Sequence, residues 1–363
     1  MFRWALFAGV TIFMGGLSTS AAVINSPFVD LDNQARSYGV SAGLNHSIGT
    51  GTFVRNNHVR EQSDRIVQIY DFSAFYRFDI RGHRLKLRPS FAFAYELTRP
   101  NSNPSRRFLP GDLRLSMIDE EIYRIPKVDI PMSSSVSWSV PTSLDSRRVS
   151  RMYGSLSGRV GLSRKFSHLS LYYAFGATKF FNAAKVKTSR SVFARDTDAA
   201  AISSPGFPAS NTTDPVLIDM GFANNSFALA QTLGVSYEFL PDLRVDYTLS
   251  IVNGFKYKLE RADTIESNGQ SIIVDQAQVA DGGRGRSDVW APTLSVSYAL
   301  NNALDKVFTV PLQLILSAGL SAAHPIKSAD NGDFILPFFY DSFAQNRAAN
   351  NYGSFFVKIM GIY

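Results

Sequence analysis

Apolar and polar residues alternate with a period of two in stretch after stretch of this chain, and this pattern limits the folds available to it. Residues 66–80, IVQIYDFSAFYRFDI, place mostly apolar side chains at even positions, whereas Asp71, Ser73, Arg77 and Asp79 occupy odd ones. Residues 85–97, LKLRPSFAFAYEL, repeat the arrangement. Because successive side chains of a strand point to opposite faces, the pattern predicts β-strands with one apolar and one polar face.

The same alternation recurs along the whole chain. We expect strands at residues 38–48, 66–80, 85–97, 152–162, 169–181, 227–239, 243–257, 290–300, 308–320 and 352–363. Each is close to the ~9–11 residues that a tilted strand needs to cross a membrane. The connections alternate between short ones, such as RGHR at 81–84, and long polar ones at about 50–64, 99–148, 182–225, 258–287 and 321–350. The sequence therefore predicts an all-β, transmembrane, antiparallel up-and-down β-barrel of about ten strands, with short periplasmic turns and long extracellular loops.

A second interpretation has twelve strands. Residues 133–140, SSSVSWSV, also alternate, but the only neighbour that could pair with them, IDEEIYRIPKVDI at 118–130, is too acidic to face lipid. We interpret both stretches as strand extensions or loop hairpins above the membrane, and twelve strands as the alternative.

The N-terminal residues predict export from the cytoplasm. Residues 1–22 combine Arg3, an apolar stretch and small residues at 20–22, which is typical of a cleaved signal peptide. Residues 23–36 are then either a periplasmic leader or a plug for the lumen, and 37–363 form the barrel. The absence of cysteine excludes a lipoprotein anchor. A mean hydropathy of −0.04 excludes a bundle of membrane helices. The chain lacks a dense Lys/Arg run, so nucleic acid is not an expected partner.

The C-terminal stretch, YGSFFVKIMGIY, has an alternating apolar row that ends on an aromatic residue: Phe355, Val357, Ile359 and Tyr363. In this feature the chain resembles Gram-negative outer-membrane β-barrel proteins, and it is porin-like in general architecture. The resemblance implies that barrel-insertion machinery reads this row, although Tyr replaces the usual Phe and Gly361 interrupts the row. It also implies an outer-membrane location with both termini periplasmic, and contact with lipid and lipopolysaccharide. Arginines of the expected outer loops would bind lipopolysaccharide phosphates.

The polar faces predict the lining of the lumen. Small residues dominate it in strands 38–48, 227–239 and 290–300, which leaves room for water, a narrow solute or an inserted peptide. Inward charges gather near the periplasmic end, and hairpin pairing would place Asp79 beside Lys86 and Glu238 beside Arg244. These charges form either a constriction that selects solutes or an ion-pair network that stiffens the wall. The full set is Arg77, Asp79, Lys86, Arg88, Glu238, Arg244, Asp246 and Lys358.

Catalytic, metal and cofactor sites are not predicted. The five histidines are scattered without paired-ligand spacing. His46, with Asp64 and Asp71 nearby in sequence, is the best of the rim candidates, but we interpret it as an interface histidine. The leading function is a narrow passive channel or transporter for small solutes. The main alternative is a non-conducting structural or interaction barrel, and a barrel-borne hydrolase is third.

Small and polar residues interrupt the expected lipid-facing rows of three consecutive strands. Gly154 and Gly158 lie in 152–162, Ala177 in 169–181, and Gln231 in 227–239. Small residues let backbones approach, and an amide that faces lipid needs a partner. Our hypothesis is therefore a homo-oligomer seam at these four residues. The alternative is ordinary variation in one strand together with a locally bulged register.

Overall fold

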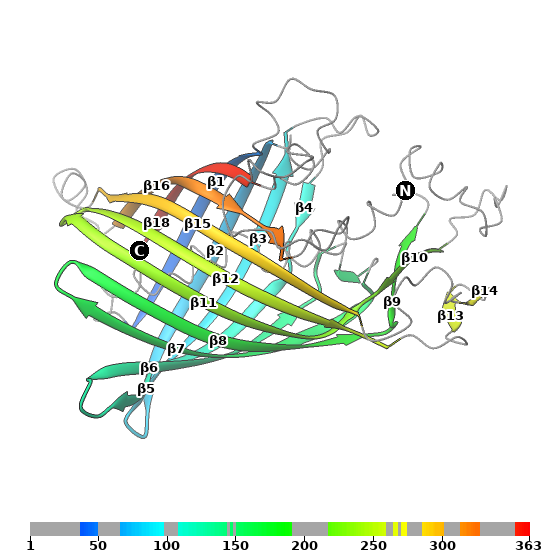
Figure 1. The fold of residues 1–363 in the computed structure, drawn as a ribbon, viewed down its shortest axis with the longest axis horizontal. Helices are drawn as coiled ribbons and strands as arrows, with labels where there is room; N and C mark the ends of the chain where they lie inside the picture. Colours follow the sequence, from blue (N-terminus) through cyan, green and yellow to red (C-terminus); the bar gives the residue numbers. More distant parts are fainter. Residues whose placement is uncertain are drawn as a thin grey trace.

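Twelve long strands pair edge to edge around a closed circuit in the computed structural model (Figure 1). The structure describes residues 37–49, 66–97, 108–143, 146–147, 150–190, 217–258, 264–267, 270–273, 285–300, 313–326 and 353–363. The predicted signal peptide, the 23–36 segment and most of the long connections lie outside these residues. The circuit strands are β1 (Tyr38–Gly49), β2 (Ile66–Ile80), β3 (His83–Glu96), β5 (Leu113–Ile125), β6 (Ile130–Val140), β7 (Met152–Phe166), β8 (Leu169–Asn182), β11 (Asn225–Leu240), β12 (Leu243–Lys256), β15 (Arg286–Ala299), β16 (Gln313–Ala322) and β18 (Gly353–Ile362).

Closure of the circuit depends on two pairings. The order runs β12, β11, β8, β7, β6, β5, β3, β2, β1, β18, β16, β15, and β15 pairs again with β12. Strand β1 pairs with β18, and the last residue extends that ladder, because Tyr363 and Val40 exchange two backbone hydrogen bonds of 2.9 Å. The C-terminal strand therefore joins the first strand, as the sequence predicts, and these strands have no free edge along that ladder.

The expectation of about ten strands is wrong, and the alternative of twelve is confirmed. Residues 99–148 are not one outer loop, because they contain β5 and β6, which pair with each other and join β3 to β7. Strand β5 begins at Leu113, before the acidic stretch, so Leu113, Leu115 and Met117 supply its exposed apolar row. The acidic residues follow at its far end, where they need not face lipid.

One end of the barrel, the turn end, carries the short hairpin turns. Arg81 and Gly82 form a two-residue turn with φ values of 52° and 84°, the left-handed conformation that tight hairpins require. Ser167–His168 and Pro241–Asp242 are the two-residue connections from β7 to β8 and from β11 to β12, and of these four residues only Ser167 has a positive φ, of 49°. Residues 126–129 connect β5 to β6. Tyr363 also lies at the turn end (Figure 1).

The opposite end, the loop end, carries short additional strands. Strand β4 (Phe108–Pro110) extends the pairing of β3 beyond Gly111, and β17 (His324–Pro325) pairs with β15. Two separate ladders lie there as well, β9 (Val186–Arg190) with β10 (Leu217–Ala223), and β13 (Thr264–Ser267) with β14 (Gln270–Ile273) (Figure 1). These ladders belong to connections that the sequence analysis predicts as long loops.

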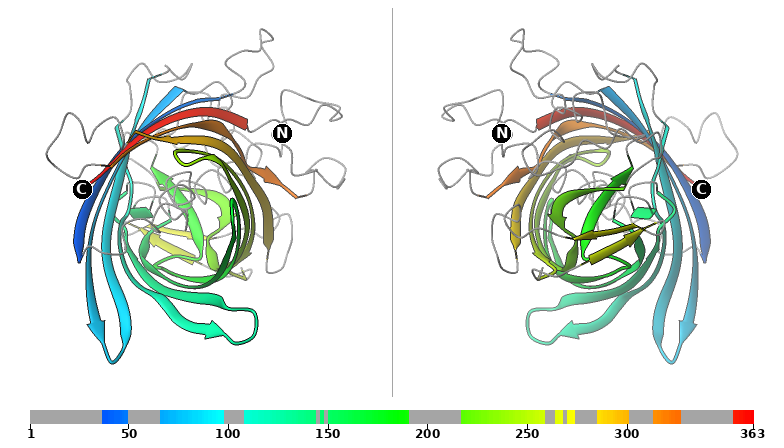
Figure 2. Two further views of the ribbon diagram at one scale, coloured as in Figure 1. Left: turned by 90° about the vertical axis from the view of Figure 1, so that its left-hand side faces the viewer. Right: turned by 90° about the vertical axis from the view of Figure 1, so that its right-hand side faces the viewer.

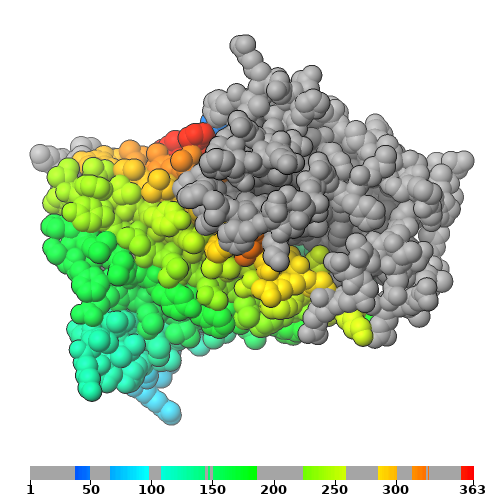
Figure 3. Space-filling model, viewed as in Figure 1, coloured from blue at the N-terminus to red at the C-terminus, as the bar shows by residue number. Residues whose placement is uncertain are grey.

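The outer face is apolar and exposed. On β18, Phe355, Val357, Ile359 and Tyr363 point outward and are 43–55% exposed, whereas Phe356, Lys358 and Met360 point inward and are buried. The side chains of β5 to β15 form a continuous outer wall in the space-filling view (Figure 3). Among the described residues, no helix is long and apolar enough to cross a membrane.

Aromatic side chains gather at both ends of this outer face. Near the loop end, Tyr70 stacks on Phe93 at 4.8 Å between ring centroids, and Trp138 meets Phe181 at 5.7 Å. Near the turn end, Tyr237 contacts Phe239 at 4.7 Å. Two aromatic bands that flank an apolar belt are the pattern of outer-membrane barrels, in which the rings lie at the two membrane interfaces.

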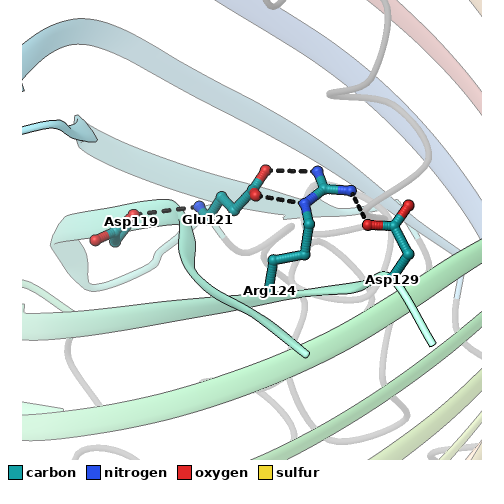
Figure 4. Close-up of polar contacts among 4 residues, drawn as sticks. All are labelled: Asp119, Glu121, Arg124 and Asp129. Carbon is teal, nitrogen blue, oxygen red and sulfur yellow. Dashed lines mark hydrogen bonds and ion pairs between the residues drawn. The ribbon is translucent and has the colours of Figure 1, made fainter. Parts of the chain in front are cut away.

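The β5–β6 hairpin extends past the end of β3 at the turn end. Strand β3 pairs with β5 only up to Asp119, whereas β5 continues with β6 to Ile125, and the hairpin tip projects from the barrel rim (Figure 2). Arg124 holds the tip together, because its guanidinium contacts Glu121 at 2.7 Å and Asp129 at 3.0 Å (Figure 4). These groups are exposed to solvent, so we expect the network to contribute little to the stability of the barrel.

Cysteine pairs can distinguish twelve strands from ten, because the chain contains no cysteine of its own. Leu87 lies opposite Met117 across the β3–β5 ladder, where Cα atoms are about 4.5–5.5 Å apart and a disulfide fits. We expect the Leu87→Cys/Met117→Cys variant to form an internal disulfide under mild oxidation, measured by peptide mass spectrometry.

A matched control pairs Leu87→Cys with Val160→Cys on β7, the strand that a ten-strand barrel would place beside β3. This variant should remain reduced. Cross-linking of the control, and not of the first pair, would show that β5 and β6 lie outside the wall.

Candidate functional site: the inner face of the barrel

Hydroxyl groups line much of the inner face in directly opposed pairs. At six places, a serine or threonine on one strand bonds to a hydroxyl on the next strand at 2.7–3.0 Å. Within each pair, each hydroxyl makes one hydrogen bond to the other. Each hydroxyl also keeps a lone pair or a proton with which it can bond to solvent. The pairs are Ser41–Ser73, Ser116–Ser137, Ser157–Thr178, Thr232–Ser250, Ser297–Ser317 and Ser321–Ser354.

The glycines of β1 face inward as predicted, but large side chains from neighbouring strands lie across them. A Cβ at Gly39 would lie 2.6 Å from the Phe75 ring, and one at Gly43 would overlap the Asp71 carboxylate. On this side of the barrel, the small residues therefore accommodate neighbours that lie flat on the wall, and they do not widen the lumen.

The group that lies across Gly43 is a buried ion pair. Lys358 on β18 contacts Asp71 on β2, with Nζ 3.1 Å from the carboxylate, and the two side chains are 1% and 4% exposed. The ion pair spans β1, which lies between β18 and β2. Gly43 on β1 is directly opposite Asp71 of β2 on one side and Met360 of β18 on the other. Two buried charges in contact are strongly coupled, since either one alone would remain desolvated without compensation.

A second charged cluster lies near the turn end. Arg77 contacts Glu120 at 3.0 Å, and Lys86 contacts the same carboxylate at 3.7 Å. Both cations also lie over the Phe75 ring, at 4.7 and 4.9 Å from its centroid. The carboxylate comes from β5, so this cluster connects the β2–β3 hairpin to β5.

Three arginines occupy the inner face of β3, β5 and β7. Arg88 is on β3, Arg114 on β5 and Arg159 on β7, and each is only half-buried. Arg88 donates a hydrogen bond to Ser73 at 3.3 Å, and the Arg159 guanidinium lies 5.6 Å from the Tyr172 ring. Arg114 is within electrostatic reach of both other arginines.

The opposite wall is uncharged at the middle of the barrel. In the circuit, β12 is six strands away from β3, and β15 is six strands away from β5. Their inner faces carry Thr248 and Ser250, and Thr293 and Ser295, all half-buried. Solvent therefore reaches the inner face on both sides, and the charge is concentrated on one of them.

The predicted lumen charges form separate groups. Lys358 belongs to the Asp71 pair, Arg77 and Lys86 to the Glu120 cluster, and Arg88 to the arginine group. Arg244 contacts Asp246 two residues along the same strand, at 3.0 Å. Glu238 is opposite Arg244 in the ladder, as predicted, but its ion pair is with Lys165 at 2.9 Å.

The predicted Asp79–Lys86 neighbourhood is wrong. Asp79 is opposite Arg84, and Lys86 is opposite Arg77. The prediction assumed a four-residue turn at 81–84, and the two-residue turn moves the register by two positions.

The predicted set of lumen charges omits Asp71, Arg114, Glu120, Arg159 and Lys165, although the sequence analysis places Asp71 on the polar face of residues 66–80. Arg114 and Glu120 were missed because β5 was assigned to a loop. Asp71, Arg159 and Lys165 occupy polar-face positions of strands that were predicted, so alternation alone could have identified them.

The rim candidate His46 does not form a site with Asp71. His46 is on β1, opposite Gln68 of β2 and Val357 of β18. Because His46 is next to the inward-facing Asn45, it faces outward, whereas Asp71 faces the lumen. Asp64 lies outside the described residues. Within the described part of the chain, no group of three or more potential ligand residues could hold a metal ion.

The four predicted seam residues differ in their surroundings. Gly158 is directly opposite Ala177, and a Cβ at Gly158 would meet no atom within 4 Å. Gly154 is covered, because a Cβ there would lie 2.6 Å from the Trp138 ring. Gln231 lies one strand further, opposite Phe175.

Comparisons with known proteins return outer-membrane barrels. An outer membrane channel from Pseudomonas putida F1 has a TM-score of 0.44 and 11% identity, covering 90% of this chain and 96% of that one. The Pseudomonas putida toluene transporter TodX has a TM-score of 0.36 and 11% identity, with 95% and 92% covered. The beta domain of a Bordetella autotransporter has a TM-score of 0.36 and 11% identity, with 90% and 99% covered. No family model and no curated protein matches the chain.

Removal of Asp71 tests the buried ion pair. Asp71→Asn leaves the Lys358 ammonium buried without its carboxylate, so we expect a loss of about 3 kcal/mol in the free energy of unfolding. Denaturant titration in detergent micelles, followed by heat-modifiable gel mobility, measures this change.

Two further variants complete this test. Asp71→Asn combined with Lys358→Met should recover most of the loss, because no unpaired charge remains. Glu121→Gln, at the exposed hairpin tip, should change the stability by less than about 1 kcal/mol. An Asp71→Asn barrel as stable as the unmodified one would contradict the assigned role of the pair.

Proposed function

We propose that the protein is a narrow passive channel or transporter for small solutes in the outer membrane of a Gram-negative bacterium. One observation carries the proposal: a closed barrel with an apolar exterior has an inner face lined by paired hydroxyls, and eight of the twelve residues in these pairs are partly exposed to solvent. Hydroxyl groups exchange hydrogen bonds with water and with polar solutes, so such a lining supports passage of a hydrated or hydroxylated species.

The orientation follows from the unequal connections. Outer-membrane barrels have short periplasmic turns and longer extracellular loops, so the turn end with Tyr363 faces the periplasm and the loop end faces outward. In this proposal the signal peptide at 1–22 directs export, insertion machinery reads the Phe355–Tyr363 row, and loop arginines contact lipopolysaccharide.

A second candidate is an interaction barrel that assembles with copies of itself. The observation that favours it is the pairing of Gly158 with Ala177 on the outer face, which leaves a shallow patch between larger apolar side chains. Another barrel wall could approach closely there. Gly154 does not contribute to this patch, since the Trp138 ring covers it. A hydrolase is not proposed, because His46 and Asp71 face opposite sides of the wall.

Planar bilayer recordings test the channel. We expect discrete conductance steps from the purified, heat-modifiable barrel in KCl, because the hydroxyl-lined interior admits water and ions. A folded barrel without conductance in channel recordings, and without solute uptake in liposome swelling, would exclude the channel and leave the interaction barrel.

Leucine substitution tests the seam. Gly158→Leu fills the patch, so we expect it to convert an oligomer into a monomer without loss of heat-modifiability. Native mass spectrometry in mild detergent measures the assembly. The matched control is Ala42→Leu, which adds similar bulk to the outer face of β1 and should leave the assembly intact. A monomeric unmodified protein contradicts the seam.

A further inference from the structure

One row of side chains crosses the outer face of four neighbouring strands near the loop end. Lys179 on β8 is directly opposite Phe227 on β11. Phe227 is opposite Phe255 on β12, and Phe255 is opposite Arg286 on β15. The row therefore consists of a cation, two aromatic rings and a second cation, and we name these four residues the cation–aromatic row.

All four residues of the row face away from the lumen. Each lies an even number of positions from an exposed apolar residue of its own strand, and side chains at even spacing share a face. These reference residues are 36–51% exposed: Phe175 on β8, Leu233 on β11, Tyr247 on β12 and Val296 on β15.

Aromatic rings occupy the space between the two cations. The ring centroids of Phe227 and Phe255 are 6.0 Å apart, and the Arg286 guanidinium lies 5.7 Å from the Phe255 ring. The Lys179 ammonium lies 5.7 Å from the ring of Tyr257, whose hydroxyl donates a hydrogen bond of 3.3 Å to a backbone carbonyl of β8. Adjacent strands are about 4.8 Å apart, so the Cα atoms of the two cations, three strands apart, are about 14 Å apart.

Both cations keep donors that the described residues do not use. Lys179 is exposed, and its contact within this part of the chain is with the Tyr257 ring. Arg286 is 56% exposed and donates its Nε–H to Asp288 at 2.7 Å, which leaves the N–H groups of its two terminal nitrogens. Asp288 also accepts a hydrogen bond from Asn253 at 2.6 Å, so the carboxylate that orients Arg286 is itself held in place.

Cations are rare on the outer face. Among the outward positions of the twelve circuit strands, three carry lysine or arginine: Lys179 and Arg286 in the row, and Arg164 on β7 near the turn end. A cation that faces lipid hydrocarbon is costly, so such residues belong at an interface, where lipid headgroups supply anions. The two cations near the loop end flank the same pair of rings.

The row combines donors for phosphate with an apolar surface for acyl chains. Guanidinium and ammonium groups bind phosphate oxygens through charge-assisted hydrogen bonds, and aromatic rings pack at the boundary between headgroups and acyl chains. We propose that the cation–aromatic row binds one phosphorylated glycolipid of the outer leaflet, the lipid A part of lipopolysaccharide, with its phosphate groups on Lys179 and Arg286. The site rests on the orientation proposed above, with the loop end outward, and not on conduction.

Native mass spectrometry of the purified full chain in mild detergent, titrated with lipid A, tests the site. We expect one retained lipid per barrel. Lys179→Gln and Arg286→Gln should each lower the apparent affinity roughly three- to tenfold, because each removes a charge-assisted hydrogen bond to phosphate. The matched control is Arg164→Gln, which removes an outward cation that lies 4.7 Å from the Phe166 ring at the opposite end and should leave the affinity unchanged. Unchanged affinity in the two row variants, or an equal loss in the control, would overturn the proposal.

Competition with a phospholipid tests the choice of lipid. Phosphatidylglycerol carries a single phosphate, so it should displace lipid A only at a much higher concentration. Displacement at equal concentration would refute the assignment to the glycolipid. Heat-modifiable mobility of each variant establishes that a loss of affinity does not come from unfolding.

Two further measurements separate the site from the proposed orientation and from the channel. Lys127→Cys at the β5–β6 hairpin tip should not react with a membrane-impermeant maleimide on intact cells, and a reaction there would place the row in the wrong leaflet and refute the site. A barrel that retains lipid A without conducting supports the site and refutes the channel. A conducting barrel that retains no lipid A refutes the site and leaves the channel.

Discussion

Backbone hydrogen bonding is the constraint on which the rest of this structure depends. A strand in lipid has no water to bond to its N–H and C=O groups, so both edges of each strand must pair with another strand. The sheet must therefore close on its first strand. Here β18 pairs with β1, and the two backbone hydrogen bonds between Tyr363 and Val40 complete this ladder. Once the circuit closes, alternate side chains are divided between lipid and lumen, and the function lies in the second set.

The two halves of the wall use their inward side chains differently. Around β18, β1 and β2, charges are paired and large groups lie flat over glycines, as in the Asp71–Lys358 pair across Gly43. This packing joins the closing strands to their neighbours. Around β3, β5 and β7, Arg88, Arg114 and Arg159 share the inner face, and the charges of Arg88 and Arg159 act on Arg114. Of the two roles that the sequence analysis poses as alternatives for the inward charges, stiffening of the wall fits the part around Gly43.

Much of the barrel could be predicted because alternation is a local property of the sequence. The faces of ten strands, the closing strand and the Glu238–Arg244 register follow from it directly. The β5–β6 hairpin could not be predicted in this way, because its acidic residues at 119–121 obscure the apolar row that begins at Leu113. These acidic residues lie at the rim of the barrel, and the sequence alone does not show where the rim is. Register across the Arg81–Gly82 turn failed for a related reason: a two-residue and a four-residue turn fit the same letters, and the choice moves Asp79 from Lys86 to Arg84.

The error over β5 also hid the most informative part of the lumen. Without β5 and β6, strands β3 and β7 would be neighbours, Arg88 and Arg159 would lie on adjacent strands, and the row Ser116, Ser137 and Ser157 would not exist. The two inserted strands add Arg114 and two of the three hydroxyls between the flanking guanidinium groups. They also separate Arg88 from Arg159, which reduces the mutual repulsion of these two charges. The hairpin thus both widens the circuit and adds Arg114, Ser116 and Ser137 to the inner face.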